Sequence, residues 1–342
     1  MKNTKPKVRL WSVLTGLTAI LTVAAIVGNI IANQYATTLN VALNASTYKI
    51  IHGENTGDTE YFKKGFASDE EREAYEAELC ATVEAEGAAL LKNENNALPL
   101  ASGAKVSLFG HGSVDLMYGG TGSGSVDTSK APNLKQALEA QGITINQTLW
   151  DLYSSDSMMS KYSRLTPASI SDTLEANTQY AVNEAPWSAL SSAESSFAEY
   201  GDAAIVVVSR VGGEAGAYYP GEEGLADGVH TVNGNILSLS DEEMAMIEEA
   251  KANFDKVIVL VNAANPMEIS NLEEDPDIDA ILWVGYPGAY GFYGVADVLN
   301  GTVAPSAHLG DTFVKNGALA PAMQNFGNIP WANASDFAEG TS

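Results

Sequence analysis

The sequence has little positive charge, almost no cysteine and few histidines. It contains 18 Lys and Arg residues against 43 Asp and Glu residues, and its formal net charge is -25. Binding to phosphate backbones needs clustered Lys and Arg, so this composition argues against a nucleic-acid partner. A single cysteine, Cys80, excludes an internal disulfide. The histidines are scattered and form no metal-ligand spacing with it, so no metal site is predicted.

Several sequence motifs of enzymes are also missing. Neither of the glycine-rich patterns that bind phosphate, G-x-x-x-x-G-K-[ST] and G-x-G-x-x-G, occurs in the chain. The G-x-S-x-G turn of serine hydrolases is absent too. These absences disfavour a nucleotide-binding domain and a hydrolase with a serine nucleophile.

The N-terminus contains a long uncharged segment. Residues 1–9 are basic, and no charged residue occurs between Arg9 and Lys49. The most apolar part runs from about Leu10 to Ala32, which at about 1.5 Å per residue crosses the hydrocarbon core of a bilayer. Because a cleaved signal peptide has an apolar region of only about 7–15 residues, an uncleaved anchor is favoured. The positive-inside rule then predicts a single-pass protein of the cell membrane, with a cytoplasmic N-terminus and an extracellular main domain.

Beyond the anchor, predicted strands alternate with predicted helices. Helices are expected at 68–89, 131–142, 240–254 and 292–301, and strands at 105–110, 143–146, 203–209, 256–266 and 278–288. The continuous Val and Ile runs indicate strands that are buried on both faces. The sequence therefore predicts an α/β fold, a doubly wound and mostly parallel sheet sandwiched by helices, preceded by one transmembrane helix.

The expected organisation has five parts. They are a cytoplasmic basic tail (1–9), a transmembrane anchor (10–34), a stalk or entry segment (35–67), an α/β sandwich domain (68–315) and a tail (316–342).

In an open α/β sheet, ligands bind in the loops that follow the carboxyl ends of the strands. One such loop, "RVGGEAGAYYPGEEG" (210–224), holds Glu214 among glycines. Partial burial there would raise the pKa of Glu214, as a general acid requires. Glu222, Glu223 and Asp227 are alternatives, and a solvated loop acid without a catalytic role is another.

Two further features near the strand ends have open interpretations. The glycine-rich loop at 110–127 is either a surface loop or a segment that contacts sugar or another domain. An aromatic group near the strand ends is either core and interface or a platform for sugar stacking. Its members are Tyr218, Tyr219, Trp283, Tyr286, Tyr290 and Tyr293.

Several stretches resemble, in order, the α/β sandwich domain of family 3 glycoside hydrolases, the β-glucosidase-like enzymes. They include "EAEGAALLKNENNALPL" (84–100), "VVVSRVGGEAG" (206–216), "ADVLNG" (296–301) and "PSAHL" (305–309). The resemblance covers roughly residues 70–315. It implies that this chain contains the C-terminal-type sandwich domain of the family. It also implies the reversed domain order of some members, in which the sandwich domain precedes the (β/α)8 barrel domain.

The resemblance assigns roles to individual residues. Glu214 falls on the general acid/base of a retaining mechanism, in which two carboxyl groups stand about 5–5.5 Å apart. Substrate contacts are expected from Tyr218, Tyr219, Ser123 and Ser125. The substrate would be a β-linked oligosaccharide or glucoside, and neither a metal nor an organic cofactor is implied.

The other catalytic carboxylate of the family, a nucleophilic aspartate, belongs to the barrel domain. No barrel is recognisable in this sequence, so the tail at 316–342 is expected to lead toward a missing domain. The chain alone is expected to be inactive as a glycosidase. The alternative is a non-catalytic, membrane-tethered module for carbohydrate binding or assembly.

Overall fold

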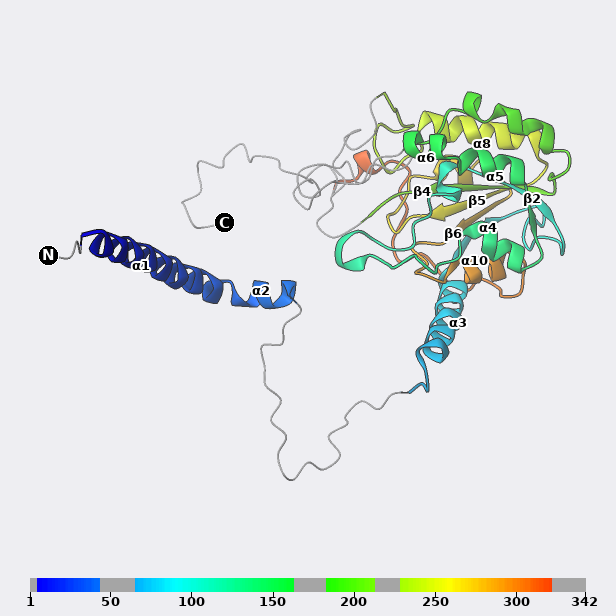
Figure 1. The fold of residues 1–342 in the computed structure, drawn as a ribbon. Coiled ribbons are helices and arrows are strands. Elements are labelled where there is room, and N and C mark those ends of the chain that lie inside the picture. Colours follow the sequence, from blue (N-terminus) through cyan, green and yellow to red (C-terminus); the bar gives the residue numbers. More distant parts are fainter. Residues whose placement is uncertain (1–4, 44–64, 163–182, 213–227, 322–342) are drawn as a thin grey trace. The chain divides into compact units, whose positions relative to one another are not determined.

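A computed structural model describes residues 5–43, 65–162, 183–212 and 228–321 of the protein (Figure 1). The chain divides into two compact units, residues 1–65 and residues 66–342. Each unit is described by itself below.

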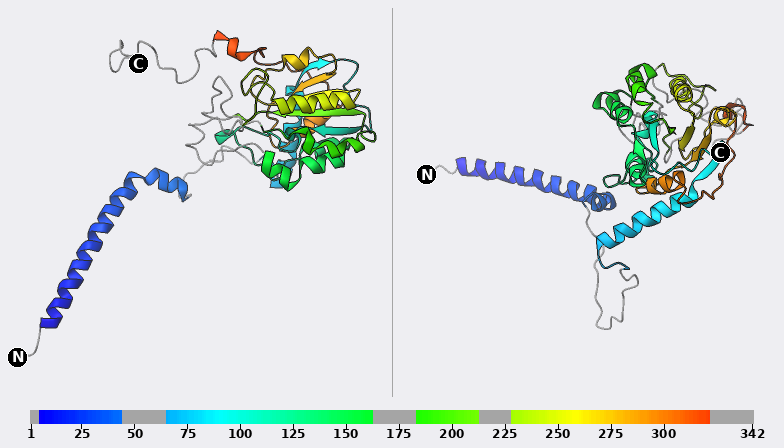
Figure 2. Two further views of the ribbon diagram at one scale, coloured as in Figure 1. Left: turned by 90° about the horizontal axis from the view of Figure 1, so that it is seen from above. Right: turned by 90° about the vertical axis from the view of Figure 1, so that its right-hand side faces the viewer.

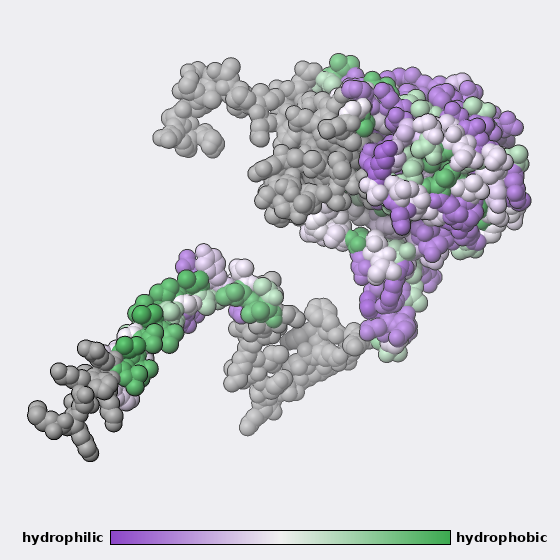
Figure 3. Space-filling model, turned by 45° about the horizontal axis from the view of Figure 1, so that its top comes forward, coloured by the Kyte–Doolittle hydropathy of each residue, from purple (hydrophilic) through white to green (hydrophobic). Residues whose placement is uncertain are grey.

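The first unit consists of the long helix α1 (Lys5–Gln34) and the short helix α2 (Ala36–Ala42). Within α1, the 25 residues Leu10–Gln34 have a mean hydropathy of 2.1, and their side chains are exposed. Figure 3 shows this helix as a largely hydrophobic surface. The helix is long and apolar enough to cross a membrane, and a signal sequence at the N-terminus would have the same properties.

The second unit is built on a six-stranded sheet in the order β1-β6-β5-β4-β2-β3. The strands are β1 (Ala89–Asn93), β2 (Lys105–Phe109), β3 (Thr144–Ile145), β4 (Ala203–Ser209), β5 (Val257–Asn262) and β6 (Ala280–Trp283). All neighbouring strands are parallel except β1 and β6, which are antiparallel. The prediction of an α/β fold with a mostly parallel sheet is confirmed.

Helices cover both faces of this sheet (Figures 1 and 2). One face packs against α3 (Asp69–Gly87), α4 (Leu134–Ala140) and α10 (Phe292–Leu299). The other packs against α5 (Gln147–Tyr153), α8 (Asp241–Asn253) and α9 (Ser270–Glu273), and α6 (Asp156–Tyr162) follows α5. In β4, Ile205 and Val207 contribute to the first core while Val206 and Val208 contribute to the second. An unbroken apolar run is needed because both faces of the strand are buried.

The edge strand β1 was not predicted from the sequence. Its residues directly follow α3 and resemble the apolar end of a helix, yet Ala89 pairs with Trp283 in the antiparallel ladder. The strand ends in a turn in which Asn95 and Asn96 have φ values of 53° and 55°. Asparagine tolerates this left-handed region better than most residues, so the "NENN" sequence indicates the turn but not the strand before it.

Helices α3 and α10 approach closely at Gly294. A Cβ atom at this position would lie 2.1 Å from the carbonyl oxygen of Ala81 and 2.8 Å from the backbone nitrogen of Ala85. Both neighbours are backbone atoms of α3, so no flexible side chain can move aside. The absence of a side chain at Gly294 therefore allows the two helices to pack at this distance.

We expect Gly294→Ala to lower the free energy of unfolding by about 1–3 kcal/mol, because the added methyl group overpacks the contact between the helices. Gly87→Ala is the matched control, since no atom lies within 4 Å of a Cβ there. Denaturant unfolding followed by tryptophan fluorescence measures both variants. Equal stability of the two variants would contradict this account of the contact.

Candidate functional site

The sheet has a topological switch point between β2 and β4. From β2 the chain passes through α4, on one face, to its neighbour β3. It then returns to β4, on the other side of β2, and continues through α8 on the opposite face. The loops after β2 and β4 therefore diverge, and such a divergence leaves a crevice at the carboxyl ends of the strands. These are the loops in which the sequence predicts Ser123, Ser125 and Glu214.

A buried amide joins three of the loops at this edge. Asn262, the last residue of β5, is fully buried. Its Oδ1 accepts a hydrogen bond from the Met117 backbone nitrogen at 2.7 Å, and its Nδ2 donates to the carbonyl oxygens of Met117 (2.9 Å) and Gly285 (2.8 Å). One side chain therefore connects the segments that follow β2, β5 and β6.

The loops after β2 and β4 also contact each other directly. The backbone nitrogen of Thr121 donates to the carbonyl oxygen of Gly212 at 3.0 Å. A Cβ at Gly212 would lie 2.9 Å from the Tyr286 hydroxyl, so this close approach excludes a side chain. The contact fixes the point at which the loop of Glu214 leaves the sheet.

The predicted site residues differ in what the structure says of them. Ser123 and Ser125 are exposed, and they follow Thr121, whose backbone contacts Gly212, by two and four residues in the sequence. Glu214 follows Gly212 by two residues in the sequence. Glu214, Tyr218 and Tyr219 themselves lie outside the described residues, so their roles remain predictions.

Arg210, immediately after β4, is one of the largest fully buried side chains among the described residues. Its guanidinium donates to both carboxylate oxygens of Glu243, at 2.7 and 2.8 Å. The remaining N–H groups donate to the carbonyl oxygens of Ser209, Ile236 and Ser238. A guanidinium can be buried at low cost only when its charge is paired and its donors are satisfied, as they are here.

Glu243 has a second role in the same network. It occupies the third position of α8, and its carboxylate accepts from the Ser240 backbone nitrogen at 2.8 Å while the Ser240 hydroxyl accepts from the Glu243 nitrogen. These reciprocal hydrogen bonds form a capping box, which the spacing of Ser240 and Glu243 in the sequence indicates. The Arg210–Glu243 pair therefore connects the start of the Glu214 loop to the N-terminus of α8.

We expect Glu243→Gln to lower the free energy of unfolding by about 3–5 kcal/mol, because it leaves the Arg210 charge buried without a counter-charge. Glutamine still accepts the capping hydrogen bond, so the loss reports on the ion pair rather than on the helix cap. Glu242→Gln, on the same turn, is the control. A chemical-denaturation curve for Glu243→Gln that superimposes on the control would overturn this interpretation.

The loop after β2 begins at two backbone N–H groups held by buried side chains. The nitrogen of Gly110, which has a φ of +92°, donates to the Tyr153 hydroxyl at 3.0 Å. The nitrogen of His111 donates to Glu184 Oε2 at 2.6 Å, and the Ala185 nitrogen donates to Oε1 at 2.9 Å. Burial raises the pKa of Glu184 to about 8 despite these hydrogen bonds, and the nearby Glu243 carboxylate raises it further.

The raised pKa of Glu184 has a consequence for stability. From its usual value of 4.5 up to about 8, the folded protein holds a proton that the unfolded chain releases. Stability is therefore lost as pH rises through this window, with a slope of at most about 1.4 kcal/mol per pH unit for one group. Glu84 on α3 contributes in the same direction, because burial raises its pKa to about 8 as well.

We expect Glu184→Gln to flatten the decline in unfolding free energy between pH 4.5 and 8 by up to about 1.4 kcal/mol per pH unit. Glutamine keeps an oxygen that can accept from His111 but does not titrate. Glu86→Gln, an exposed position, should leave the slope unchanged. A slope in Glu184→Gln identical to that of the control would show that Glu184 does not titrate in this range.

The sequence interpretation missed Arg210, Asn262 and Glu184. Arg210 carried a usable signal, since it is a lone cation between a buried strand and glycines. The aromatic group is clarified in part: Trp283 donates to the Ala263 carbonyl and Tyr286 donates to the Arg210 carbonyl, so both secure the backbone of the loops.

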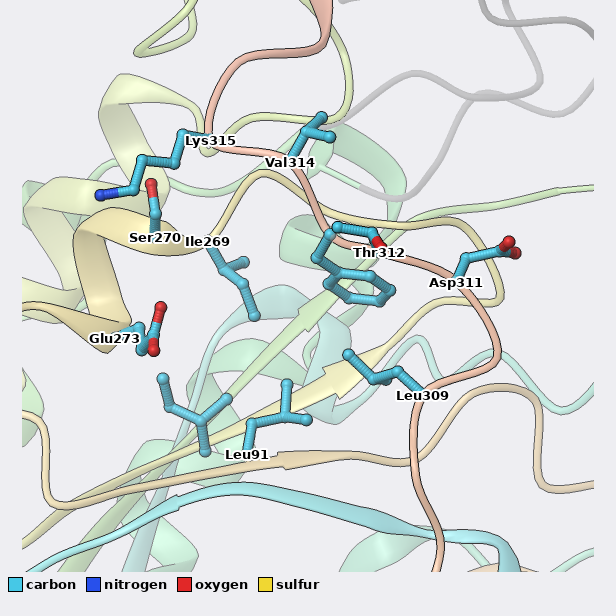
Figure 4. Close-up of a pocket in the computed structure, with 11 residues that line it drawn as sticks. Leu91, Ile269, Ser270, Glu273, Leu309, Asp311, Thr312, Val314 and Lys315 are labelled. Atoms are coloured by element: carbon cyan, nitrogen blue, oxygen red, sulfur yellow. The ribbon is translucent and has the colours of Figure 1, made fainter.

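The pockets that the described residues line include two of similar volume. One has a volume of about 330 Å³ and lies beside β1, β6 and the segment 309–315. In Figure 4, Leu91, Ile269 and Leu309 point into it while Asp311 points away. Of the predicted site residues, the two that the structure describes, Ser123 and Ser125, do not line this pocket. The second, of about 320 Å³, lies at the carboxyl edge of the sheet and includes Glu184.

The family model named "Glycosyl hydrolase family 3 C-terminal domain" matches residues 88–341. This chain belongs to glycosyl hydrolase family 3. Its sheet and switch-point loops are therefore those of the C-terminal domain of the family.

Similar curated proteins include several β-glucosidases. β-Glucosidase A of Butyrivibrio fibrisolvens is 29% identical, with 73% of this chain and 30% of that protein covered. The β-glucosidase of Ruminococcus albus is also 29% identical, with 73% and 24% covered. This family 3 chain thus corresponds to less than a third of the length of these relatives.

Two solved structures of β-glucosidases are similar to this chain in fold. The β-glucosidase of Paenibacillus barengoltzii has a TM-score of 0.59 and 29% identity, with 73% of this chain and 25% of that chain covered. β-Glucosidase 3B of Thermotoga neapolitana, in complex with α-D-glucose, has a TM-score of 0.59 and 27% identity, with 76% and 34% covered.

Proposed function

We propose that this chain is the sandwich half of a retaining, β-glucosidase-like glycoside hydrolase, and that Glu214 is its general acid/base. The observation that carries the proposal is the position of Gly212 at the switch-point crevice, held by Thr121 and flanked by the Arg210 network. A carboxylate two residues further along starts from a rigid base at the ligand-binding edge of the sheet.

In the proposed mechanism, Glu214 protonates the leaving glycosidic oxygen in the first step. In the second step it removes a proton from the water that releases the covalent glycosyl intermediate. The nucleophilic carboxylate comes from a (β/α)8 barrel domain, and the two carboxyl groups must approach to about 5–5.5 Å. No metal or organic cofactor takes part.

The substrate is a glucoside or a β-linked oligosaccharide. In the sequence, the loop after β4 carries Glu214, Glu222 and Glu223, and such acids suit an uncharged polyol whose hydroxyl groups donate hydrogen bonds. Ser123 and Ser125 contact the sugar from the β2 side, and Tyr218 and Tyr219 contact it from the β4 side. Helix α1 anchors the chain in the cell membrane with the sandwich domain outside.

A non-catalytic, membrane-tethered module for carbohydrate binding or assembly is the second candidate. Its tether would be the apolar helix α1, in which Leu10–Gln34 is long enough to cross a membrane. Sugar binding without a contribution to turnover would distinguish this candidate from the catalytic one.

We expect the 342-residue chain alone to hydrolyse an aryl β-glucoside no faster than background, because the nucleophile is supplied by another domain. Addition of a separately expressed barrel domain from a family 3 β-glucosidase should restore turnover. In that mixture Glu214→Gln should lower the rate by about 10²–10⁴-fold, the usual contribution of a general acid or base.

Glu222→Gln and Glu223→Gln are matched controls, because they remove a carboxylate from the same loop. Both should retain the rate of the unmodified mixture. If the rate fell with either control and not with Glu214→Gln, the assignment of the acid/base to Glu214 would be wrong. Turnover by the chain alone would refute the two-domain mechanism.

A further inference from the structure

The sheet edge formed by β1 and β6 is covered on one face by an extended segment rather than by a long helix. Helix α9, which borders this edge, has only four residues. Residues 309–315 cover part of the remaining surface, and a pocket of about 330 Å³ lies between them, α9 and the two strands (Figure 4). The second core is therefore incompletely covered at this edge of the sheet.

The extended segment is fixed at its C-terminal end. The backbone nitrogen of Gly317 donates to Glu268 Oε1 at 2.6 Å, and Glu268 is only 3% exposed. The carbonyl oxygen of Lys315 accepts a hydrogen bond from Asn233 Nδ2 at 3.0 Å, and the same Nδ2 donates to Glu268 Oε2 at 2.7 Å. The segment that forms one wall of the pocket is thus tied to buried groups of the domain.

The floor of the pocket is apolar. It consists of side chains from β1, β6, the residue before α9 and the extended segment, namely Leu91, Ile281, Ile269, Leu309 and Phe313. Leu91, Ile269 and Leu309 point into the pocket (Figure 4). The volume is at the lower end of the range for small-molecule sites, about 300–1,000 Å³, so it suits one large side chain. The ring of Phe313 favours an aromatic one, because aromatic pairs gain stability beyond their buried area.

The rim of the pocket carries carboxylates without counter-charges of their own. Glu273 and Asp311 line the pocket, and Asp311 points away from its floor (Figure 4). Lys315, the one cation among the described lining residues, forms an ion pair with Glu274. Within the described part of the chain, neither Glu273 nor Asp311 forms an ion pair. A cationic group beside the inserted side chain would therefore be attracted to the rim.

Two occupants from this chain itself match the pocket less well. In a two-fold dimer of this surface, the same carboxylates would face each other and repel. The tail of the chain, residues 322–342, includes Phe326 and Trp331 but no Lys or Arg. It could offer a ring but no cation to the rim. A partner polypeptide can present both groups on neighbouring residues.

We propose that the pocket lined by Leu91, Ile281 and Phe313 is a docking site for a partner polypeptide, which inserts one aromatic side chain that lies next to a Lys or Arg residue. The aromatic group fills the apolar floor, and the cation lies at the rim beside Glu273 and Asp311. A large side chain anchored in a pocket is typical of the few residues that dominate the affinity of an interface. The inference goes beyond the proposed hydrolase function and does not depend on the acid/base assignment.

Ligand-detected NMR on the full chain in detergent tests the proposal with blocked dipeptides as probes. They are the acetylated amides of tryptophan–lysine, tryptophan–glutamate and alanine–lysine. We expect the tryptophan–lysine probe to bind at least about threefold more tightly than the tryptophan–glutamate probe, because exposed ion pairs contribute modestly. The alanine–lysine probe should show no saturable binding. Equal Kd values for the first two probes would overturn the proposal.

Tryptamine distinguishes a docking site from a site for a small molecule, because it is an aromatic amine without a peptide backbone. We expect it to bind more weakly than the tryptophan–lysine probe. An equal or higher affinity for tryptamine would assign the pocket to a small amine and reject the docking of a polypeptide.

Variants on two sides of the pocket link the binding to this place. Phe313→Ala should raise the Kd of the tryptophan–lysine probe by about threefold or more, because it removes an aromatic wall. Leu319→Ala, which is 76% exposed in the same part of the chain, is the matched control. Ser270→Phe places a ring at the rim and should abolish binding, which keeps the test valid if Phe313→Ala does not fold. Unchanged Kd values in both Phe313→Ala and Ser270→Phe would refute the assignment of the pocket.

Charge variants separate the rim from the general acidity of the protein. Glu273→Gln combined with Asp311→Asn should bring the preference for the lysine probe over the glutamate probe to within about twofold. Glu78→Gln combined with Glu86→Gln removes the same charge from exposed positions of α3 and should leave the preference unchanged. An equal loss in both double variants would reject the role of the rim. Trp331→Ala should not alter the Kd, and tighter binding in this variant would identify the tail as the occupant instead of a partner.

Discussion

The burial of one positive charge beneath the carboxyl edge of the sheet constrains the whole site. If Arg210 moved away, Glu243 would remain as a buried carboxylate without a counter-charge. If Glu243 moved away, α8 would lose its N-terminal cap. The carbonyl oxygens that the guanidinium satisfies belong to the end of β4 and to the segment before α8. One ion pair therefore fixes both ends of the segment in which the catalytic carboxylate is proposed.

The two-domain active site that we propose would depend on this rigidity. When two carboxyl groups on different domains must stand about 5–5.5 Å apart, any looseness in either half reduces the fraction of productive encounters. The clamp of Asn262 across three loops and the Thr121–Gly212 contact hold this half of the site before any partner is present. The free-energy cost of ordering these loops is therefore part of the folding of the sandwich domain, and not of its proposed docking with a barrel domain.

The parallel strands and the capping box of α8 could be predicted from the sequence because they are local. Ser240 and Glu243 are three residues apart, and the apolar runs of β4 and β5 are continuous. Strand β1 could not, because its antiparallel partner β6 is about 190 residues away and its own sequence also suits a helix end. The same reason explains why Asn262 and Glu184 were missed: their partners, Met117 and His111, are distant along the chain.

The scarcity of positive charge accounts for the chemistry of the buried acids. Glu184 and Glu268 are satisfied mainly by backbone N–H groups and asparagine amides rather than by cations. Amide donors satisfy a carboxyl group without supplying a positive charge, so nothing offsets the burial that raises the pKa of Glu184 to about 8. A site of this kind disfavours anionic ligands and holds a proton at neutral pH. The first of these properties suits the neutral glycoside that we propose as the substrate.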